Sequence, residues 1–242
     1  MGYGSYIPSP GQAIVGHDLS LFGGPIAHWS GNGTLVETIT GGAGYDLSQT
    51  SPGYVAVNPL YPGSIRFMET KERSPGVPSM NASLKLTGDT TVAGWFCITD
   101  VTIAAFVQLF SAMKSGTLTS NNNAFWGIRV QSSTLRFTGF WQSGARVDQA
   151  VTSTTVVERY RWYHVVFTRG NGSSRARIYV NGLLEAQQTG LAAHTDGSSV
   201  TAITTGHDEA GANTHIGLFS VSLYNQELTP AEVKELYESS II

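Results

Sequence analysis

The stretch RWYHVVFTRGNGSSRARIYVNGLLEA, residues 161–186, decides the fold of this chain. Its first part, WYHVVFT, alternates two largely apolar faces, which is typical of a central strand buried on both sides. A Gly-rich turn at residues 169–175 follows it. Asn181 and Gly182 then separate two further runs, as the two loop residues of a type I′ hairpin turn. The segment is therefore predicted to be a three-stranded antiparallel meander.

His164 lies in the first of these strands. A catalytic histidine needs a nucleophile or a carboxylate within hydrogen-bonding reach, and its neighbours along the strand supply none. We interpret His164 as a hydrogen-bonded structural residue, so the stretch is a piece of β-sheet and not an active site.

The rest of the chain continues this pattern. Only 13% of the 242 residues are charged and 28 are glycine, which favours a β-rich fold with many tight turns. Neither an internal repeat nor a linker divides residues 21–242, so one domain is predicted there, preceded by an extended arm at 1–20. One helix is predicted at LTPAEVKELYES, with Thr229 and Glu232 as a capping box and Pro230 at the first helical position.

Composition excludes several classes of function. The net charge is −3 and no long run of Lys or Arg occurs, which argues against nucleic-acid binding. The longest apolar stretch is too short for a membrane span, and the N-terminus has no signal-peptide pattern, so we expect folding in a cytoplasm. Cys97 is the only cysteine, so no intrachain disulfide can form, and its apolar surroundings indicate a buried residue.

The meander also resembles the W-H-V-A…D-G…I-Y-V-N-G segment of laminin-G-like, concanavalin A-like jelly-roll domains. THIGLFSVSLYNQELTPAEVKELY (214–237) is similar to the closing strand and helix of that superfamily, and PIAHW, PGSIRF and LKLTGDTTVAGWF are similar to its opening strands. The resemblance covers residues 21–240. It implies an all-β fold: an antiparallel two-sheet jelly-roll β-sandwich with one short C-terminal helix. Phe219 stands where the family pattern has an Asp, so the resemblance does not imply a polar or ion-linked role at this position.

Some relatives with this fold are glucanases, which carry their catalytic carboxylates on one strand as a Glu-x-Asp run. Residues at i and i+2 share a strand face, which gives the roughly 5–5.5 Å separation that a retaining mechanism needs. The acidic residues of this chain never stand at i and i+2. We therefore predict that the protein is not an enzyme and needs no cofactor.

Two groups of residues are candidate ligand sites. In TTGHDEAGANTH (204–215), Asp208, Glu209 and Asn213 offer hard oxygen atoms to Ca²⁺, although a solvated loop explains the same residues. Sugar binding uses an aromatic platform with polar neighbours. The candidates are Trp141, Gln142, Arg146, Asp148 and Trp126. The alternative is that the two tryptophans are buried in the core.

Two functions fit these observations. The first is a structural module of a virion, a phage capsid decoration or tail protein, whose N-terminal arm binds neighbouring subunits and whose domain holds glycans weakly. The second is a secreted or surface lectin, with or without calcium. Under the first we expect a homo-oligomer or assembly component located in the virion, and under the second an extracellular protein that binds cell-surface glycans.

Overall fold

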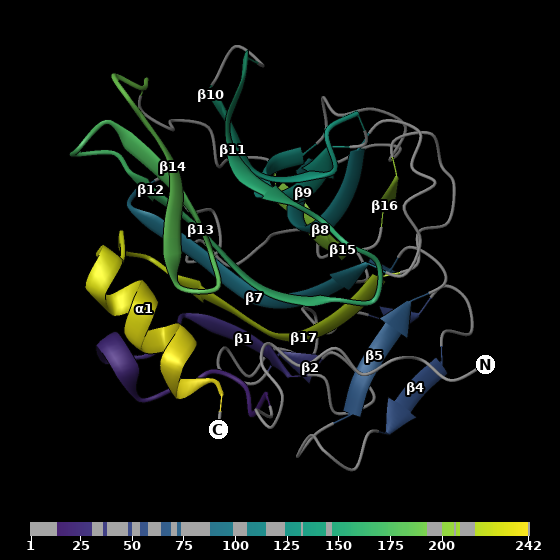
Figure 1. Ribbon diagram of the computed structural model, residues 1–242. Coiled ribbons are helices and arrows are strands. Elements are labelled where there is room, and N and C mark those ends of the chain that lie inside the picture. Colours follow the sequence, from purple (N-terminus) through teal and green to yellow (C-terminus); the bar gives the residue numbers. More distant parts are fainter. Residues whose placement is uncertain are drawn as a thin grey trace.

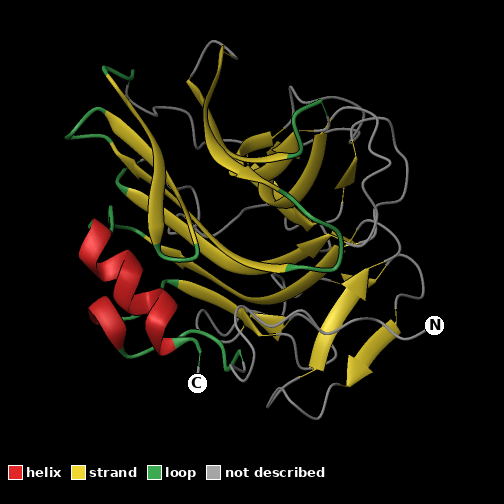
Figure 2. Ribbon diagram, in the orientation of Figure 1, coloured by secondary structure: helices red, strands yellow, loops and turns green. Residues whose placement is uncertain are grey.

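A computed structural model shows two antiparallel β-sheets packed face to face, with one short helix near the C-terminus (Figures 1 and 2). This confirms the predicted all-β jelly-roll sandwich. The residues that the structure describes are 14–30, 36–37, 48–49, 54–57, 64–68, 72–73, 88–98, 106–114, 124–131, 133–143, 147–192, 200–205, 207–208 and 216–241. No helix in this part of the chain is long and apolar enough to cross a membrane.

The first sheet has nine strands among the described residues. Seven strands form its main path, and β5 joins it by pairing with β17 and with β4. In spatial order the path is β14 (Leu183–Thr189), β13 (Arg175–Val180), β12 (Trp162–Gly170), β7 (Thr90–Ile98), β17 (Ile216–Tyr224), β1 (Ala27–Ser30) and β2 (Val36–Glu37), with β5 at Ser64–Met68 and β4 at Tyr54–Val57.

The second sheet has eight strands among the described residues, and β16 (His207–Asp208) pairs with β8 outside its main path. That path runs through β11 (Val147–Val156), β10 (Arg136–Ser143), β9 (Ala124–Gln131), β8 (Phe106–Lys114), β15 (Val200–Thr205), β6 (Glu72–Arg73) and β3 (Ser48–Gln49).

The main core lies between the two sheets. In β12, Tyr163, Val165 and Phe167 belong to it, while Trp162 and Val166 pack in smaller clusters on the opposite side of the strand. All nine residues of β12 are buried, as predicted for a central strand. The meander prediction is confirmed: β12 pairs with β13, and β13 pairs with β14 across a two-residue turn.

Helix α1 (Pro230–Ser239) lies on the outer side of the nine-stranded sheet (Figure 1). The capping box is present as predicted, since Thr229 accepts from the Glu232 backbone N–H and the Glu232 carboxylate accepts from the Thr229 N–H. Residues 14–24, with a 3-10 turn η1 (Leu21–Gly23), lie on the same side. Residues 1–13 of the predicted arm lie outside the described residues, whereas residues 14–20 contact the domain.

Candidate functional site

A row of polar side chains crosses the outer face of the eight-stranded sheet. Alternate residues of β8, β9 and β10 belong to the core, namely Val107, Leu109, Ile128, Val130 and Phe137. The residues between or beside them therefore point away from the core. The backbone register places these outward residues directly opposite one another on four neighbouring strands. They are Gln108 in β8, Arg129 in β9, Thr138 in β10 and Thr152 in β11, and we call them the buried row.

Arg129 is the central residue of the buried row. Its guanidinium carbon lies 4.0 Å from the ring centroid of Phe106 and 4.7 Å from that of Phe140, so two aromatic rings hold the charge by cation–π contacts. Arg129 is 5% exposed and Gln108 is 2% exposed. Further along the row, the Thr138 and Thr152 hydroxyl oxygens are 3.1 Å apart and share a hydrogen bond.

A second row lies beside the first and is half-buried. Phe106 is paired with Gln131, and Gln131 is paired with Arg136, so a phenyl ring, an amide and a guanidinium adjoin on three strands. We call Phe106, Gln131 and Arg136 the half-exposed row. Its polar groups are only weakly held, because the Thr134 hydroxyl to Gln131 Oε1 and Arg136 Nη1 to Ser153 carbonyl distances are both 3.4 Å. Solvent therefore reaches groups that remain able to bind a ligand.

The tryptophans predicted to form a sugar platform lie in the core instead. Trp141 and Trp126 are each 1% exposed, and the Trp141 ring stacks on Phe167 of the other sheet with 5.9 Å between centroids. The Arg169 guanidinium lies 5.2 Å from the Trp141 ring. An exposed platform at Trp141 and Trp126 is thus corrected to a buried contact between the sheets.

The remaining predicted ligand residues can be placed only in part. Gln142 and Asp148 are paired through their backbones at the ends of β10 and β11, while their side chains and the whole of Arg146 lie outside the described residues. Asp208 lies in β16, and its backbone pairs with that of Val107 in β8. Glu209 and Asn213 also lie outside the described residues, and within those residues no group of three His, Cys, Asp or Glu side chains is arranged to hold a metal ion.

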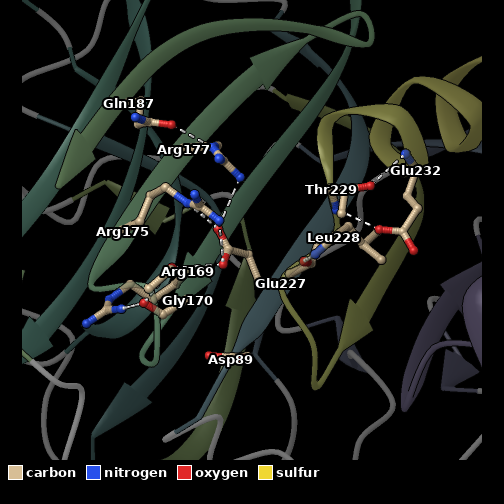
Figure 3. A network of polar contacts seen from close by, with 12 residues as sticks. Asp89, Arg169, Gly170, Arg175, Arg177, Gln187, Glu227, Leu228, Thr229 and Glu232 are labelled. Atoms are coloured by element: carbon tan, nitrogen blue, oxygen red, sulfur yellow. Dashed lines mark hydrogen bonds and ion pairs between the residues drawn. The ribbon is translucent and has the colours of Figure 1, made fainter.

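Two arginines of the opening stretch, Arg175 and Arg177, converge on one carboxylate that the sequence did not single out. Glu227, in the loop between β17 and α1, accepts from Arg175 Nε at 2.9 Å and from Arg175 Nη2 and Arg177 Nη1 at 3.2 Å each (Figure 3). The Ser173 hydroxyl donates to it at 2.9 Å. A Cβ on Gly170 would lie 2.1 Å from Glu227 Oε2, so glycine is needed there for the carboxylate to approach.

This cluster is structural. Burial alone would raise the pKa of Glu227, but hydrogen bonds from Arg175 and Ser173 and the charges of Arg175 and Arg177 outweigh it and hold the pKa below its usual value. Both arginines are therefore bonded to a carboxylate of the chain itself, which offsets one of their two positive charges. They tie the loop before α1 to β13.

His164 is buried and hydrogen-bonded, as predicted. Its Nε2 lies 2.9 Å from Nε2 of His17, and desolvation lowers its pKa to about 3. Its partner was not foreseen, because His17 precedes it by 147 residues in a segment without periodicity. Cys97 is buried as well, which raises the pKa of its thiol to about 12.

Solved structures with a similar fold include binding domains of botulinum neurotoxins. Its fold is similar to the receptor-binding domain of botulinum neurotoxin C/D mosaic serotype (TM-score 0.62, 14% identity) and to the serotype G binding domain (TM-score 0.66, 13% identity). It is also similar to the binding domain of botulinum neurotoxin DC in complex with SialylT (TM-score 0.62, 16% identity). Each alignment covers 89% of this chain and 51% of the other, so the chain spans about half the length of these neighbours.

No curated protein matches the chain by sequence. A family model, described as the concanavalin A-like lectin/glucanases superfamily, matches residues 72–234. This range contains the meander and most of the closing strand and helix that carried the resemblance. The chain belongs to the concanavalin A-like lectin/glucanase superfamily.

Proposed function

We propose that this protein is a non-enzymatic carbohydrate-binding or receptor-binding module, and that its ligand lies on the outer face of the eight-stranded sheet. The observation that carries the proposal is the half-exposed row. It presents the Phe106 ring, the Gln131 amide and the Arg136 guanidinium side by side on a rigid sheet. A sugar needs an apolar face for its ring and polar groups for its hydroxyls, and this row offers both.

Two further points support a binding role over catalysis. A retaining glycosidase of this fold needs closely spaced carboxylates on one strand, and the sequence has no acidic pair at i and i+2. No carboxylate with a described side chain belongs to β8, β9, β10 or β11. Arg136 places a guanidinium in the half-exposed row, which favours glycans that carry an acidic group.

The virion role, with partner subunits bound through the arm, stays a prediction. The comparisons concern lectin-like and receptor-binding domains, and residues 14–20 contact the chain's own helix and sheet. Calcium binding at Asp208, Glu209 and Asn213, and location in a virion or outside the cell, likewise stay predictions.

A glycan array with the full-length protein tests the proposal. The double variant Gln131→Ala, Arg136→Ala removes the polar groups of the half-exposed row. The matched control is Lys234→Ala on α1, which removes a cation from the opposite side of the molecule. We expect binding by the natural protein and the control, and at least tenfold weaker binding by the double variant with an unchanged unfolding midpoint.

The array is run with calcium and again with EDTA. Hits that EDTA leaves intact and the double variant loses support the proposed site. Hits that need calcium would instead move the site to the 204–215 loop, and no binding under either condition would refute the function. Binding that the double variant retains would refute the site alone.

A further inference from the structure

Three histidines distant in sequence are joined on the outer side of the nine-stranded sheet. His17 Nε2 lies 2.9 Å from His164 Nε2, and His17 Nδ1 lies 2.8 Å from the Ser222 hydroxyl. The same hydroxyl lies 2.9 Å from His28 Nδ1. The residues come from the segment before η1, from β12, β17 and β1, so the chain of hydrogen bonds crosses four elements.

This histidine chain is removed from water. His164 is fully buried, His28 is 5% exposed and His17 is 7% exposed. The ring of His164 lies 5.2 Å from that of Trp95 and 5.7 Å from that of Tyr237, measured between centroids. Two other groups with ionisable side chains, Cys97 in β7 and Tyr224 in β17, lie on neighbouring strands, and burial raises the pKa of each to about 12, so both are neutral near pH 7.

Among the described residues, no carboxylate is bonded to the His17 or His164 ring to compensate a proton. On the elements packed against them, Asp18 is exposed and bonded to Ser20, and the charged residues of α1 are exposed except for Glu232, which caps the helix. Tyr237 of α1 has a pKa raised by burial and is neutral.

The hydrogen bonds themselves accommodate neutral rings best. A neutral imidazole has one N–H donor and one acceptor nitrogen, so the contact between His17 and His164 needs one ring to donate and the other to accept. If both rings were protonated, two N–H groups would face each other at 2.9 Å. Burial lowers the pKa of His17 well below its usual value, and the neighbouring imidazoles of His164 and His28 lower it further.

His17 anchors a short segment to the domain. Its backbone N–H donates to the Ser220 hydroxyl at 2.9 Å, and the Val15 N–H donates to the Ser240 carbonyl at 2.9 Å. Ile14 bridges to Ile241 and packs in a small cluster with Cys97. The contact between the His17 and His164 rings is lost when both are protonated, because two N–H groups then face each other.

We propose that the His17–His164 contact is an acid-sensitive latch, which holds residues 14–20 on the nine-stranded sheet near pH 7 and releases them in weak acid. The strip of sheet beneath, including Cys97, becomes accessible to solvent on release. The latch is independent of the glycan site, which lies on the other sheet.

The direction and size of the effect follow from linkage. The pKa values of the closed state lie below those of solvated histidine, about 6.5, so the closed state is favoured above pH 6.5 and loses stability as pH falls. Each histidine that becomes solvated when residues 14–20 are released changes the ratio of released to bound molecules by up to tenfold per pH unit. Between pH 7.5 and 5.0 this amounts to about 30-fold per histidine.

Cys97 provides a natural reporter, because it is the only cysteine and is 2% exposed beneath this segment. The experiment measures its reaction with an aromatic disulfide that remains reactive in weak acid, from pH 7.5 to 5.0. Rates are divided by those of the urea-unfolded protein at the same pH. We expect the normalised rate to rise at least 30-fold, while far-UV circular dichroism stays constant.

Two variants test whether the rise in the Cys97 rate depends on His17. His17→Gln keeps a hydrogen-bonding side chain that does not titrate, so the rise should fall by at least tenfold. His207→Gln removes an imidazole from β16 of the other sheet and should leave the rise unchanged. An equal rise in His17→Gln would overturn the proposal, as would a Cys97 that stays protected at pH 5.0.

Hydrogen exchange of the natural protein gives a second measurement, which does not depend on a variant folding. Residues 14–20 should lose protection in weak acid while β12 keeps its own. If both lose protection at the same pH, the domain unfolds as a whole and no latch exists.

Discussion

Replacing Glu227 by Gln should destabilise the protein far more than an ordinary surface change. The glutamine keeps the shape of the side chain but removes the charge that Arg175 and Arg177 share. Removing one partner of a fully buried ion pair costs about 3–5 kcal/mol. Here the side chains of Glu227 and Arg177 are 11% exposed and that of Arg175 is 32% exposed, so water recovers part of the loss and we expect about 2–3 kcal/mol.

The matched control is Glu158→Gln, which removes the partner of Arg161 three residues away. Arg161 Nη1 lies 3.3 Å from Glu158 Oε1, but the side chain of Arg161 is 32% exposed and that of Glu158 is 63% exposed. The expected change in the free energy of unfolding is therefore at most about 0.5 kcal/mol. Urea unfolding at pH 7 measures both variants, and equal m-values show that the same transition is compared. A Glu227→Gln loss no larger than that of Glu158→Gln would refute the structural role of the cluster.

The pH dependence of the free energy of unfolding, compared between the natural protein and Glu227→Gln, tests whether the charge of Glu227 causes the loss. The folded-state pKa of Glu227 is lowered, so its contribution is present above the unfolded pKa of about 4.5 and is lost as pH falls through the lower folded value. The difference between natural protein and Glu227→Gln should therefore be constant from pH 7 to 5 and shrink below pH 4.5. A difference that persists unchanged at pH 3 would mean that packing, and not charge, holds the loop.

Three further predictions concern stability and reactivity. Thr229→Ala removes the N-cap of α1 and should cost about 1 kcal/mol in urea unfolding. Gly139→Ala should cost about 1–3 kcal/mol, since its Cβ would lie 2.1 Å from the buried ring of Phe167, whereas Gly172→Ala, with no atom within 4 Å, should be nearly neutral. Cys97, buried and with its pKa raised to about 12, should resist iodoacetamide at pH 8 until urea unfolds the protein, as mass spectrometry would show.

Features that depend on neighbouring residues could be predicted from the sequence. The hairpin turn needs positive φ at two adjacent residues, and Asn181 and Gly182 have φ of 51° and 76°. The helix begins at its capping box for a similarly local reason. The family resemblance rested on these same segments, so it indicated the fold but not the ligand.

The tryptophan platform was mispredicted because strand alternation does not say which face meets the core. Trp141 is followed at once by polar residues and a turn, but it shares its strand face with Gly139, which leaves room for Phe167 of the opposite sheet. The pairing of His17 with His164 left no local pattern at all. Such contacts depend on which distant segments of the chain meet in the fold. No short stretch of the sequence contains a pattern that predicts them.

The charged and polar groups singled out on the two outer sheet faces differ in how they are bonded, and this difference supports the proposed binding site. On the nine-stranded sheet, Glu227 accepts from Arg175 and Arg177, and His17 lies within hydrogen-bonding distance of His164, so these groups have partners within the chain. On the eight-stranded sheet, Gln131 and Arg136 are half-buried, and their side-chain hydrogen bonds to Thr134 and Ser153 are long, at 3.4 Å. A face whose polar groups are already well bonded gains little from a ligand, whereas one with weak internal bonds exchanges them for stronger ones. The same reasoning separates Arg175 and Arg177, which belong to a structural cluster, from Arg136, which belongs to the proposed site.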